Sequence, residues 1–244
     1  MPKINVYLPD DLASAVREAG VPVSVVCQAA LADAVQRIGR ARQAVGTLRD
    51  PATSAEALQR LADGLRPRTT PRLLSALRGA ATGDDGRPRA TVTSLDLLGG
   101  LLDDGENLAV RLLLAQGVDL DALARRARAA GGDEGIPPAP GGSMLSRMTL
   151  TARQACAGAL EAVVELGHNY LGCEHLLVGL ASGGGPAHAS LADHGVNPTS
   201  LRQAIRGAAA GAVHERSASR AESGAAIAEL SRRLGAVERQ LAAR

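Results

Sequence analysis

Residues 166–180 form the stretch that most constrains the fold, with the sequence Leu-Gly-His-Asn-Tyr-Leu-Gly-Cys-Glu-His-Leu-Leu-Val-Gly-Leu. Gly167 is placed to end a preceding helix, because glycine adopts the left-handed conformation without a Cβ penalty. Leu176, Leu177 and Leu180 then begin a second apolar face at helical spacing. The stretch therefore predicts two helices joined by a tight turn.

A weaker copy of the same pattern occurs earlier in the chain. Three pairs of equivalent positions are separated by 79, 79 and 78 residues: Thr70 and Thr149, Asp96 and His175, and Gly117 and Gly195. Aromatic residues supply only 1% of the chain, although 45% of its residues are hydrophobic. The core must therefore consist of Leu, Val and Ala, which favours close-packed helices. We expect an all-α body in which two repeats share one core.

With these motifs the chain resembles the Clp N-terminal domain, the adaptor- and substrate-binding head of the ClpA and ClpC unfoldases. There the run is typically Leu-Gly-His-x-Tyr-Ile-Gly-Thr-Glu-His-Leu-Leu-x-Gly-Leu. The resemblance implies two tandem four-helix Clp N repeats, here a degenerate copy over 67–130 and a second copy over 147–213. It also implies a non-catalytic module that binds peptides or protein partners and regulates or competes with a ClpC-type unfoldase.

The unfoldases carry ATPase modules after this domain, and the chain shows no sign of one. A Gly-x-x-x-x-Gly-Lys-[Ser/Thr] phosphate-binding motif is missing from the sequence. We therefore expect no enzyme activity and no cofactor. The expected partners are a peptide or protein ligand, or a ClpC-type unfoldase and its substrates.

The resemblance further implies a peptide site in the second repeat. In ClpC-type domains the glutamate of the Gly-Thr-Glu-His run and a nearby Arg-x-Thr bind arginine-phosphorylated substrates, and Glu174, Arg147 and Thr149 match these positions. A carboxylate pairs with guanidinium, while arginine and a hydroxyl group bind phosphate. The alternative is that Glu174 only favours the dipole at the start of its helix.

The first repeat keeps only part of this pattern. Arg68 and Thr70 are present, but Leu95 occupies the glutamate position and Asp96 the histidine position. At most one such pocket is therefore expected.

Cys173 and His175, together with His168, raise the question of a zinc site or a Cys-His nucleophile. Structural zinc sites need four ligands, usually including Cys-x-x-Cys pairs, and the sequence has no such pair. A nucleophile would also need a third, orienting residue, which is not evident. We predict no metal, no catalytic residue, and a buried His175 that hydrogen-bonds the helix junction.

The N-terminus carries a different pattern. Residues 3–8 alternate polar and apolar side chains, which is typical of a half-buried strand. Two amphipathic helices should follow, separated by a break at 20–24. This order resembles the ribbon-helix-helix fold of small bacterial repressors, in which outward strand side chains enter the DNA major groove. Those side chains would be Lys3, Asn5 and Tyr7.

The predicted strand leaves open what pairs with it. Pairing with the strand of a second copy would satisfy its backbone and make a homodimer. The alternative is a strand docked on the chain's own helical body. The segment is only weakly basic, and phosphate contacts normally supply most of the affinity for DNA. A DNA-binding transcriptional regulator whose Clp-like body senses a ligand is nevertheless the alternative function.

The remaining boundaries follow from composition. We expect a ribbon-helix-helix-like segment over 1–45, a connecting helix over 46–66, a Gly/Pro linker over 131–146 and an amphipathic C-terminal helix over 214–244. A net charge of +2 gives no general case for nucleic acid or membrane. Three widely spaced cysteines argue against a disulfide scaffold. With no signal peptide or long apolar run, a cytoplasmic protein without a membrane segment is expected.

Overall fold

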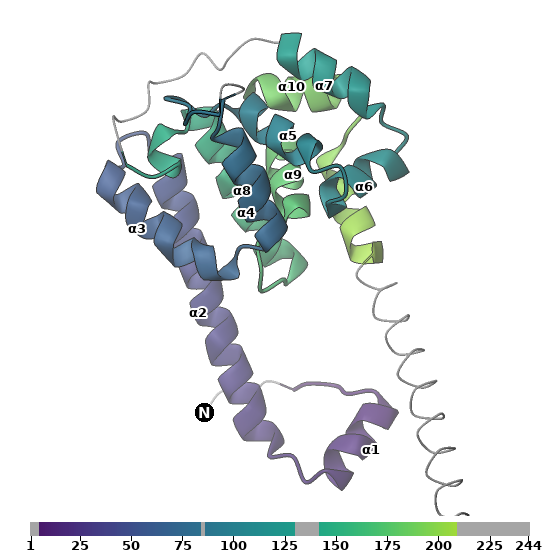
Figure 1. The fold of residues 1–244 in the computed structure, drawn as a ribbon. Coiled ribbons are helices and arrows are strands. Elements are labelled where there is room, and N and C mark those ends of the chain that lie inside the picture. The colour runs from purple at the N-terminus through teal and green to yellow at the C-terminus, as the bar shows by residue number, and fades with distance from the viewer. Residues whose placement is uncertain (1–4, 84–85, 130–141, 209–244) are drawn as a thin grey trace, which may run out of the picture.

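The computed structural model describes residues 5–83, 86–129 and 142–208, and within these ranges the chain is helical with no strand (Figure 1). The first repeat contains α4 (Pro71–Ala80), α5 (Ser94–Asp103), α6 (Leu108–Ala115) and α7 (Leu120–Ala129). The second contains α8 (Leu150–Leu166), α9 (Cys173–Ser182), α10 (Gly185–Asp193) and a further helix from 198 that is described as far as 208. The predicted all-α class is confirmed.

The two repeats begin their first helices in the same way. Thr70 caps α4 by accepting a hydrogen bond from the Leu73 N–H, and Thr149 caps α8 by accepting one from the Ala152 N–H. Each repeat enters this threonine from a 3-10 turn, η1 (Arg66–Arg68) or η2 (Leu145–Arg147). A hydroxyl at this position satisfies a helix donor that would otherwise lack a partner.

The first two helices of each repeat pack at very close range. A Cβ at Gly100 of α5 would collide with the carbonyl oxygen of Ala76, and a Cβ at Gly179 of α9 would collide with that of Ala155. Gly179 follows Gly100 by 79 residues, and Ala155 follows Ala76 by the same number, as the repeat in the sequence requires. Glycine is therefore needed at both positions so that the helix backbones can approach each other.

One apolar core runs through both repeats. It consists mainly of Leu, Ala and Val side chains, among them Leu97, Leu101, Leu113, Leu177 and Leu180, each no more than 1% exposed. Arg126 of α7 also forms an ion pair with Asp193 of α10, at 2.9 Å between Nη2 and Oδ2. The repeats are therefore two halves of one body.

Two further helices pack on the outside of the second repeat. The C-terminal part of α2 (Val23–Arg49) lies along α8, and α3 (Ala55–Leu65) lies beside it. Their contact is a second apolar cluster of Ala44, Leu48, Leu58, Ala157 and Leu160. The N-terminal part of α2 and α1 (Asp10–Glu18) project away from the body (Figure 1), and α1 has no buried residue.

The predicted N-terminal strand is absent from the described residues. Residues 5–9 have no regular secondary structure and are exposed, while 1–4 lie outside the described ranges. A strand needs a partner for its backbone groups, and the single chain offers none here. The structure thus gives the ribbon-helix-helix resemblance no support.

The other expected boundaries shift in the same region. The boundary at residue 45 falls inside α2, which continues unbroken to Arg49, and the helix expected over 46–66 is the end of α2, a turn, α3 and η1. Most of the expected linker over 131–146 and the expected helix over 214–244 lie outside the described residues. No single described helix is both long and apolar enough to cross a membrane; α1 and α2 meet that length and hydropathy only together, bent by 114°.

Candidate functional site at the second helix junction

The junction between α8 and α9 begins with a left-handed glycine. Gly167 has φ 71°, and the N–H groups of Gly167 and His168 donate to the carbonyls of Val164 and Val163. This bonding closes the C-terminus of α8 and turns the chain sharply toward α9. The predicted helix–turn–helix is therefore confirmed.

His175 holds the turn together from inside. It is fully buried, its Nδ1 accepts a hydrogen bond from the Gly172 N–H at 3.0 Å, and its Nε2 lies 2.8 Å from Nδ1 of His168. Burial, together with the neighbouring His168, lowers the pKa of His175 to about 3. The ring is neutral, so Nε2 carries the proton and donates to His168. The prediction of a buried structural histidine is confirmed.

Glu174 is buried as well, although it was predicted to bind a ligand. Only 4% of the residue is exposed, and the Tyr170 hydroxyl lies close enough to its carboxylate to affect the pKa of both groups. A Cβ at Gly172 would collide with this carboxylate, so Gly172 must be glycine. Burial raises the pKa of Glu174, and burial followed by the Glu174 charge raises the pKa of Tyr170 to about 12.

The rings of the turn form a small stacked group around this carboxylate. His168 stacks on Tyr170 with centroids 5.2 Å apart, and His175 meets both rings edge-on. Tyr170 is 38% exposed. The partly exposed Tyr170 ring thus lies beside the buried Glu174.

His168, Glu174 and His175 are close enough to share an ion, because one donor atom from each of them lies within 4.8 Å of the other two. Both nitrogens of His175 are already engaged, by the Gly172 N–H and by His168. Cys173 does not belong to this group, and burial raises its thiol pKa to about 12. This junction therefore does not bring together the four donors of a structural zinc site, and Cys173 is not activated as a thiolate.

Arg147 and Thr149 do not lie at this junction. They pair with the first repeat, because the Val92 N–H donates to the Arg147 carbonyl at 2.8 Å and the Thr149 N–H donates to the Val92 carbonyl at 2.9 Å. Arg147 also donates through Nη1 to the carbonyl of Arg89. The 17 residues of α8 separate Thr149 from the turn, a distance of about 25 Å at 1.5 Å per residue.

The arginine and threonine beside the second junction come from the first repeat. The Leu171 N–H donates to the Arg68 carbonyl at 2.8 Å, and the Thr70 N–H donates to the Leu171 carbonyl at 2.9 Å. Each Arg-x-Thr segment thus pairs with the junction of the other repeat. The glutamate-bearing junction lies beside Arg68 and Thr70, whereas Arg147 and Thr149 lie beside the junction that carries Leu95.

The first junction is stabilised by a capping box, an ion pair and apolar packing. Thr93 and Asp96 form a capping box at the start of α5, where Asp96 accepts from the Thr93 N–H just as His175 accepts from Gly172. Arg89 pairs with Asp96 at 3.2 Å, and Leu95 packs against the main core. Leu95 holds the position equivalent to Glu174, so the first junction has no carboxylate there.

Two of the three predicted DNA contacts, Asn5 and Tyr7, lie among the described residues before α1. Asn5 and Tyr7 are exposed, Tyr7 by 93%, and Lys3 is outside the described residues. No other element packs on these side chains.

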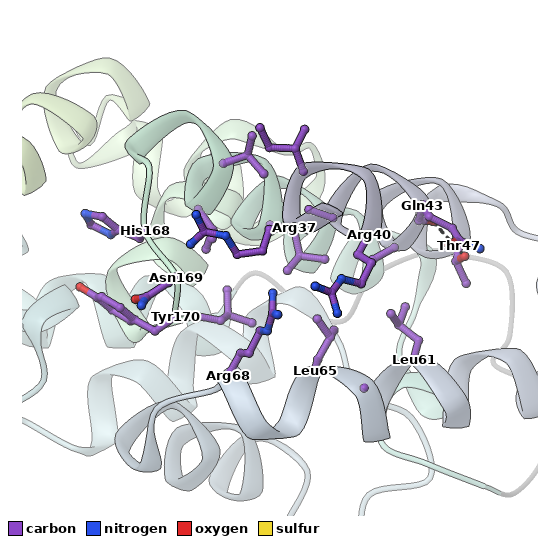
Figure 2. Close-up of a pocket in the computed structure, with 18 of the residues that line it drawn as sticks. Arg37, Arg40, Gln43, Thr47, Leu61, Leu65, Arg68, His168, Asn169 and Tyr170 are labelled. Atoms are coloured by element: carbon purple, nitrogen blue, oxygen red, sulfur yellow. Dashed lines mark hydrogen bonds between the residues drawn. The ribbon is translucent and has the colours of Figure 1, made fainter. Parts of the chain in front are cut away.

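A groove that was not predicted from the sequence lies beside the second junction. It encloses about 550 Å³ between α2, the α3–η1 segment and the end of α8 with its turn (Figure 2). Four arginines line it, namely Arg37, Arg40, Arg60 and Arg68. The spacing of Arg37 and Arg40 places them on one face of a helix, which was the available sequence indication.

Comparison with known proteins gives the second repeat a family. Residues 147–239 match the family model "Clp repeat (R) N-terminal domain". The chaperone protein ClpB of Mycobacterium tuberculosis is 32% identical over 145 residues, which cover 58% of this chain and 16% of ClpB. Since only 98 residues follow position 146, this similarity must extend into the first half of the chain.

Two other relatives show the same similarity. The uncharacterized protein Rv2667 of M. tuberculosis is 36% identical over 132 residues, covering 52% of this chain and 49% of that protein. The chloroplastic chaperone protein ClpC3 of Oryza sativa subsp. japonica is 31% identical over 113 residues, 46% of this chain and 12% of ClpC3. The chain thus spans at most about half the length of these relatives. Residues 147–239 are thus similar to the Clp repeat N-terminal domain family.

Proposed function

We propose that this chain is a non-catalytic protein-binding module that works with Clp-type machinery, either by docking on a ClpC-type unfoldase or by competing with it for substrates. The observation that carries this proposal is the second junction, where the Leu-Gly-His to Glu-His run of the family forms an ordered turn against the first repeat. The cytoplasm is part of the same proposal and is supported by the three unpaired cysteines, Cys27, Cys156 and Cys173.

The proposed ligand is a peptide that bears arginine or phosphoarginine. Glu174 would receive the guanidinium group, and Arg68 and Thr70 take the place we first expected Arg147 and Thr149 to have. Carboxylate–guanidinium and arginine–phosphate pairs are strong because they are charge-assisted and bidentate. The ligand must displace the Tyr170 hydroxyl from Glu174, and the exposure of Tyr170 makes such a movement feasible.

Calorimetric titration with a phosphoarginine peptide tests this site. Glu174→Gln should weaken binding by about 10- to 100-fold, equivalent to roughly 1.5–3 kcal/mol for a hydrogen bond to a charged group. Arg147→Gln is the matched control, because Arg147 lies at the other end of α8, and it should bind as the wild type does. Equal loss in both variants, or no loss in Glu174→Gln, would show that the site is not at the second junction.

The unfoldase proposal has its own experiment. Purified ClpC-type unfoldase is passed over the immobilised chain, and its ATPase and degradation rates are measured with and without the free chain. A docking module should retain the unfoldase and change its rates, whereas a substrate competitor should slow degradation of arginine-phosphorylated substrate without retaining the unfoldase. If neither effect is seen at micromolar concentration, the proposal is refuted.

Self-association and DNA binding through the N-terminal arm remain separate proposals. The arm comprises α1 and the projecting part of α2, and its exposed apolar residues, including Val25, Leu31 and Val35, would be covered by a second copy. The exposed Asn5 and Tyr7 are accessible to DNA. A gel-shift assay with random duplexes, repeated on the double variant Asn5→Ala/Tyr7→Ala, tests this, and a shift that is unchanged in the variant would exclude those contacts.

A further inference from the structure

The groove beside the second junction has walls that the Clp repeats do not supply. Its residues on α2 and α3, from Ala34 to Leu65, precede the first repeat, whereas Arg68 belongs to the start of that repeat. The third wall comes from α8 and the turn at 167–171. The family match begins at residue 147. The groove therefore lies between helices that precede the repeats and the second repeat on which they pack.

The rim of the groove is positively charged. None of its lining residues is Asp or Glu, while four are arginine. Figure 2 shows Arg37, Arg40 and Arg68 with their guanidinium groups turned toward the same space. Three like charges repel each other in one groove, so the arrangement favours an anionic occupant.

The four arginines are not equally neutralised by their surroundings. Arg37 is paired with Asp33 at 3.1 Å, and Arg60 lies near Glu56. Arg40 makes only a long bond of 3.4 Å to the Gln36 carbonyl. Arg68 has no side-chain partner among the described residues. Arg40 and Arg68 are thus the two cations best able to pair with a ligand.

The floor of the groove is apolar. It consists of side chains from three elements: Ile38 and Ala41 of α2, Leu61 and Leu65 of α3, and Leu160 and Val164 of α8. Most of them are only half-buried. An occupant that carried charge alone would leave this floor in water, so the groove also favours apolar side chains.

We propose that this groove binds an acidic segment of a partner protein, with carboxylates on Arg40 and Arg68 and alternate apolar side chains on the floor. The 11 residues of α3 extend over about 16 Å at 1.5 Å per residue, which is the length of about five residues of extended chain. The groove shares Arg68 with the proposed arginine site, but the inference does not depend on that site, because it uses Arg40 and the apolar floor and makes no use of Glu174.

Fluorescence anisotropy on the full chain tests the proposal, with a labelled hexapeptide that alternates leucine and glutamate. Arg40→Gln and Arg68→Gln should each weaken binding by about 3- to 10-fold. Arg42→Gln and Arg66→Gln are matched controls on the same elements, because neither residue lines the groove. They should change binding by less than about twofold, since exposed charges outside the site are screened.

A second variant distinguishes binding of the peptide from binding of a simple anion. Gly64 lines the groove, and a Cβ there meets nothing within 4 Å, so Gly64→Leu fills the floor without strain and keeps every arginine. It should abolish peptide binding. Replacing the peptide's leucines with alanine should weaken binding by at least about tenfold, by the usual value of buried methylene groups.

Four outcomes would overturn the proposal. They are no binding by the wild type, equal weakening by the control variants, full binding by Gly64→Leu, and displacement of the peptide by inorganic phosphate or a short DNA duplex as effectively as by unlabelled peptide. Glu174→Gln should leave this peptide's affinity unchanged, so failure of the groove and failure of the arginine site would be distinguished.

Discussion

Two adjacent glycines of α5 have opposite surroundings. A Cβ at Gly100 would meet the Ala76 carbonyl of the neighbouring helix, whereas one at Gly99 would meet nothing within 4 Å. Gly100→Ala should lower the free energy of unfolding by about 1–3 kcal/mol, because a backbone atom must move. Gly99→Ala should raise it by about 0.5–1 kcal/mol, since glycine is unfavourable inside a helix. Urea denaturation followed by circular dichroism measures both, and equal effects would contradict the close packing of α4 and α5.

At the same scale, His175 makes stability depend on pH. Its folded-state pKa of about 3 lies below the ordinary value of 6.5, so below pH 6.5 the unfolded chain binds the additional proton. The stabilising effect of the neutral ring is therefore present above pH 6.5 and is lost as pH falls toward 3. The slope is at most about 1.4 kcal/mol per pH unit for one proton.

His175→Asn tests this dependence, since an amide oxygen can still accept the Gly172 N–H, as Asp96 does in the first repeat. The free energy of unfolding should fall less steeply between pH 6.5 and 4 in the variant than in the wild type. The raised pKa of Glu174 acts in the opposite direction, because that group loses its stabilising proton as pH rises. The comparison is therefore repeated in a Glu174→Gln background. There the free energy of unfolding of the chain that keeps His175 should depend on pH more steeply than it does with Glu174 present. Identical pH slopes for the His175 chain and the His175→Asn variant would refute the predicted role of His175.

At the scale of the elements, α2 is joined to α8 by one buried and one exposed arginine. Arg153 of α8 is 6% exposed and donates to the carbonyl of Asp50, the C-cap of α2, at 3.3 Å. Burial lowers the pKa of Arg153, although an arginine stays charged. Arg49 and Glu161 form the exposed pair.

Arg153→Ala should lower the free energy of unfolding by about 1.5–3 kcal/mol, because it leaves the end of α2 without a charged donor and removes the buried stem. Arg49→Gln should cost less than about 1 kcal/mol, as exposed ion pairs do. Thermal and urea denaturation compare the two. A larger loss in Arg49→Gln would mean that the exposed pair, and not the buried arginine, holds α2 on the body.

The helices of the repeats could be predicted from sequence because their determinants are local. Gly167 ends its helix through its own conformation, and the apolar faces on either side of it follow from spacing within a few residues. The N-terminal strand could not be predicted reliably in this way. A strand needs a partner strand for its backbone groups, and alternation in residues 3–8 says nothing about whether such a partner exists.

The grouping of Glu174 with Arg147 and Thr149 shows another limit. All three belong to one repeat in the sequence, and the motif treats a repeat as a unit. In the structure each repeat lends its Arg-x-Thr segment to the other, through the pairs of Thr69 with Leu171 and Val92 with Met148. Such an exchange leaves no mark on periodicity, so local reasoning assigns the residues of a composite site to the wrong partner.

At the scale of the whole molecule, burial is confined to the repeat body and the helices packed on it. In α2 only Ala44 and Leu48 are buried, and α1 has no buried residue. A solitary helix of two or three turns is marginal in water, and the arm exposes apolar side chains such as Val25, Leu31 and Val35. The arm therefore contributes little to the stability of a single chain.

Two deletions separate these contributions. Removing 1–33 takes away the arm up to Asp33, including Val25 and Leu31, and leaves the residues of the groove and of both apolar clusters in place. The free energy of unfolding should therefore stay within about 0.5 kcal/mol of the wild type, as for changes at an exposed surface. Removing 1–45 also takes away Ala44 and most of the α2 wall, and should lower stability by more than about 1 kcal/mol. If a second copy covers the arm, light scattering at tens of micromolar should show a dimer for the wild type and a monomer for the shorter deletion. A wild-type monomer would exclude self-association, and a deletion of 1–33 that remains dimeric would locate the interface on the body.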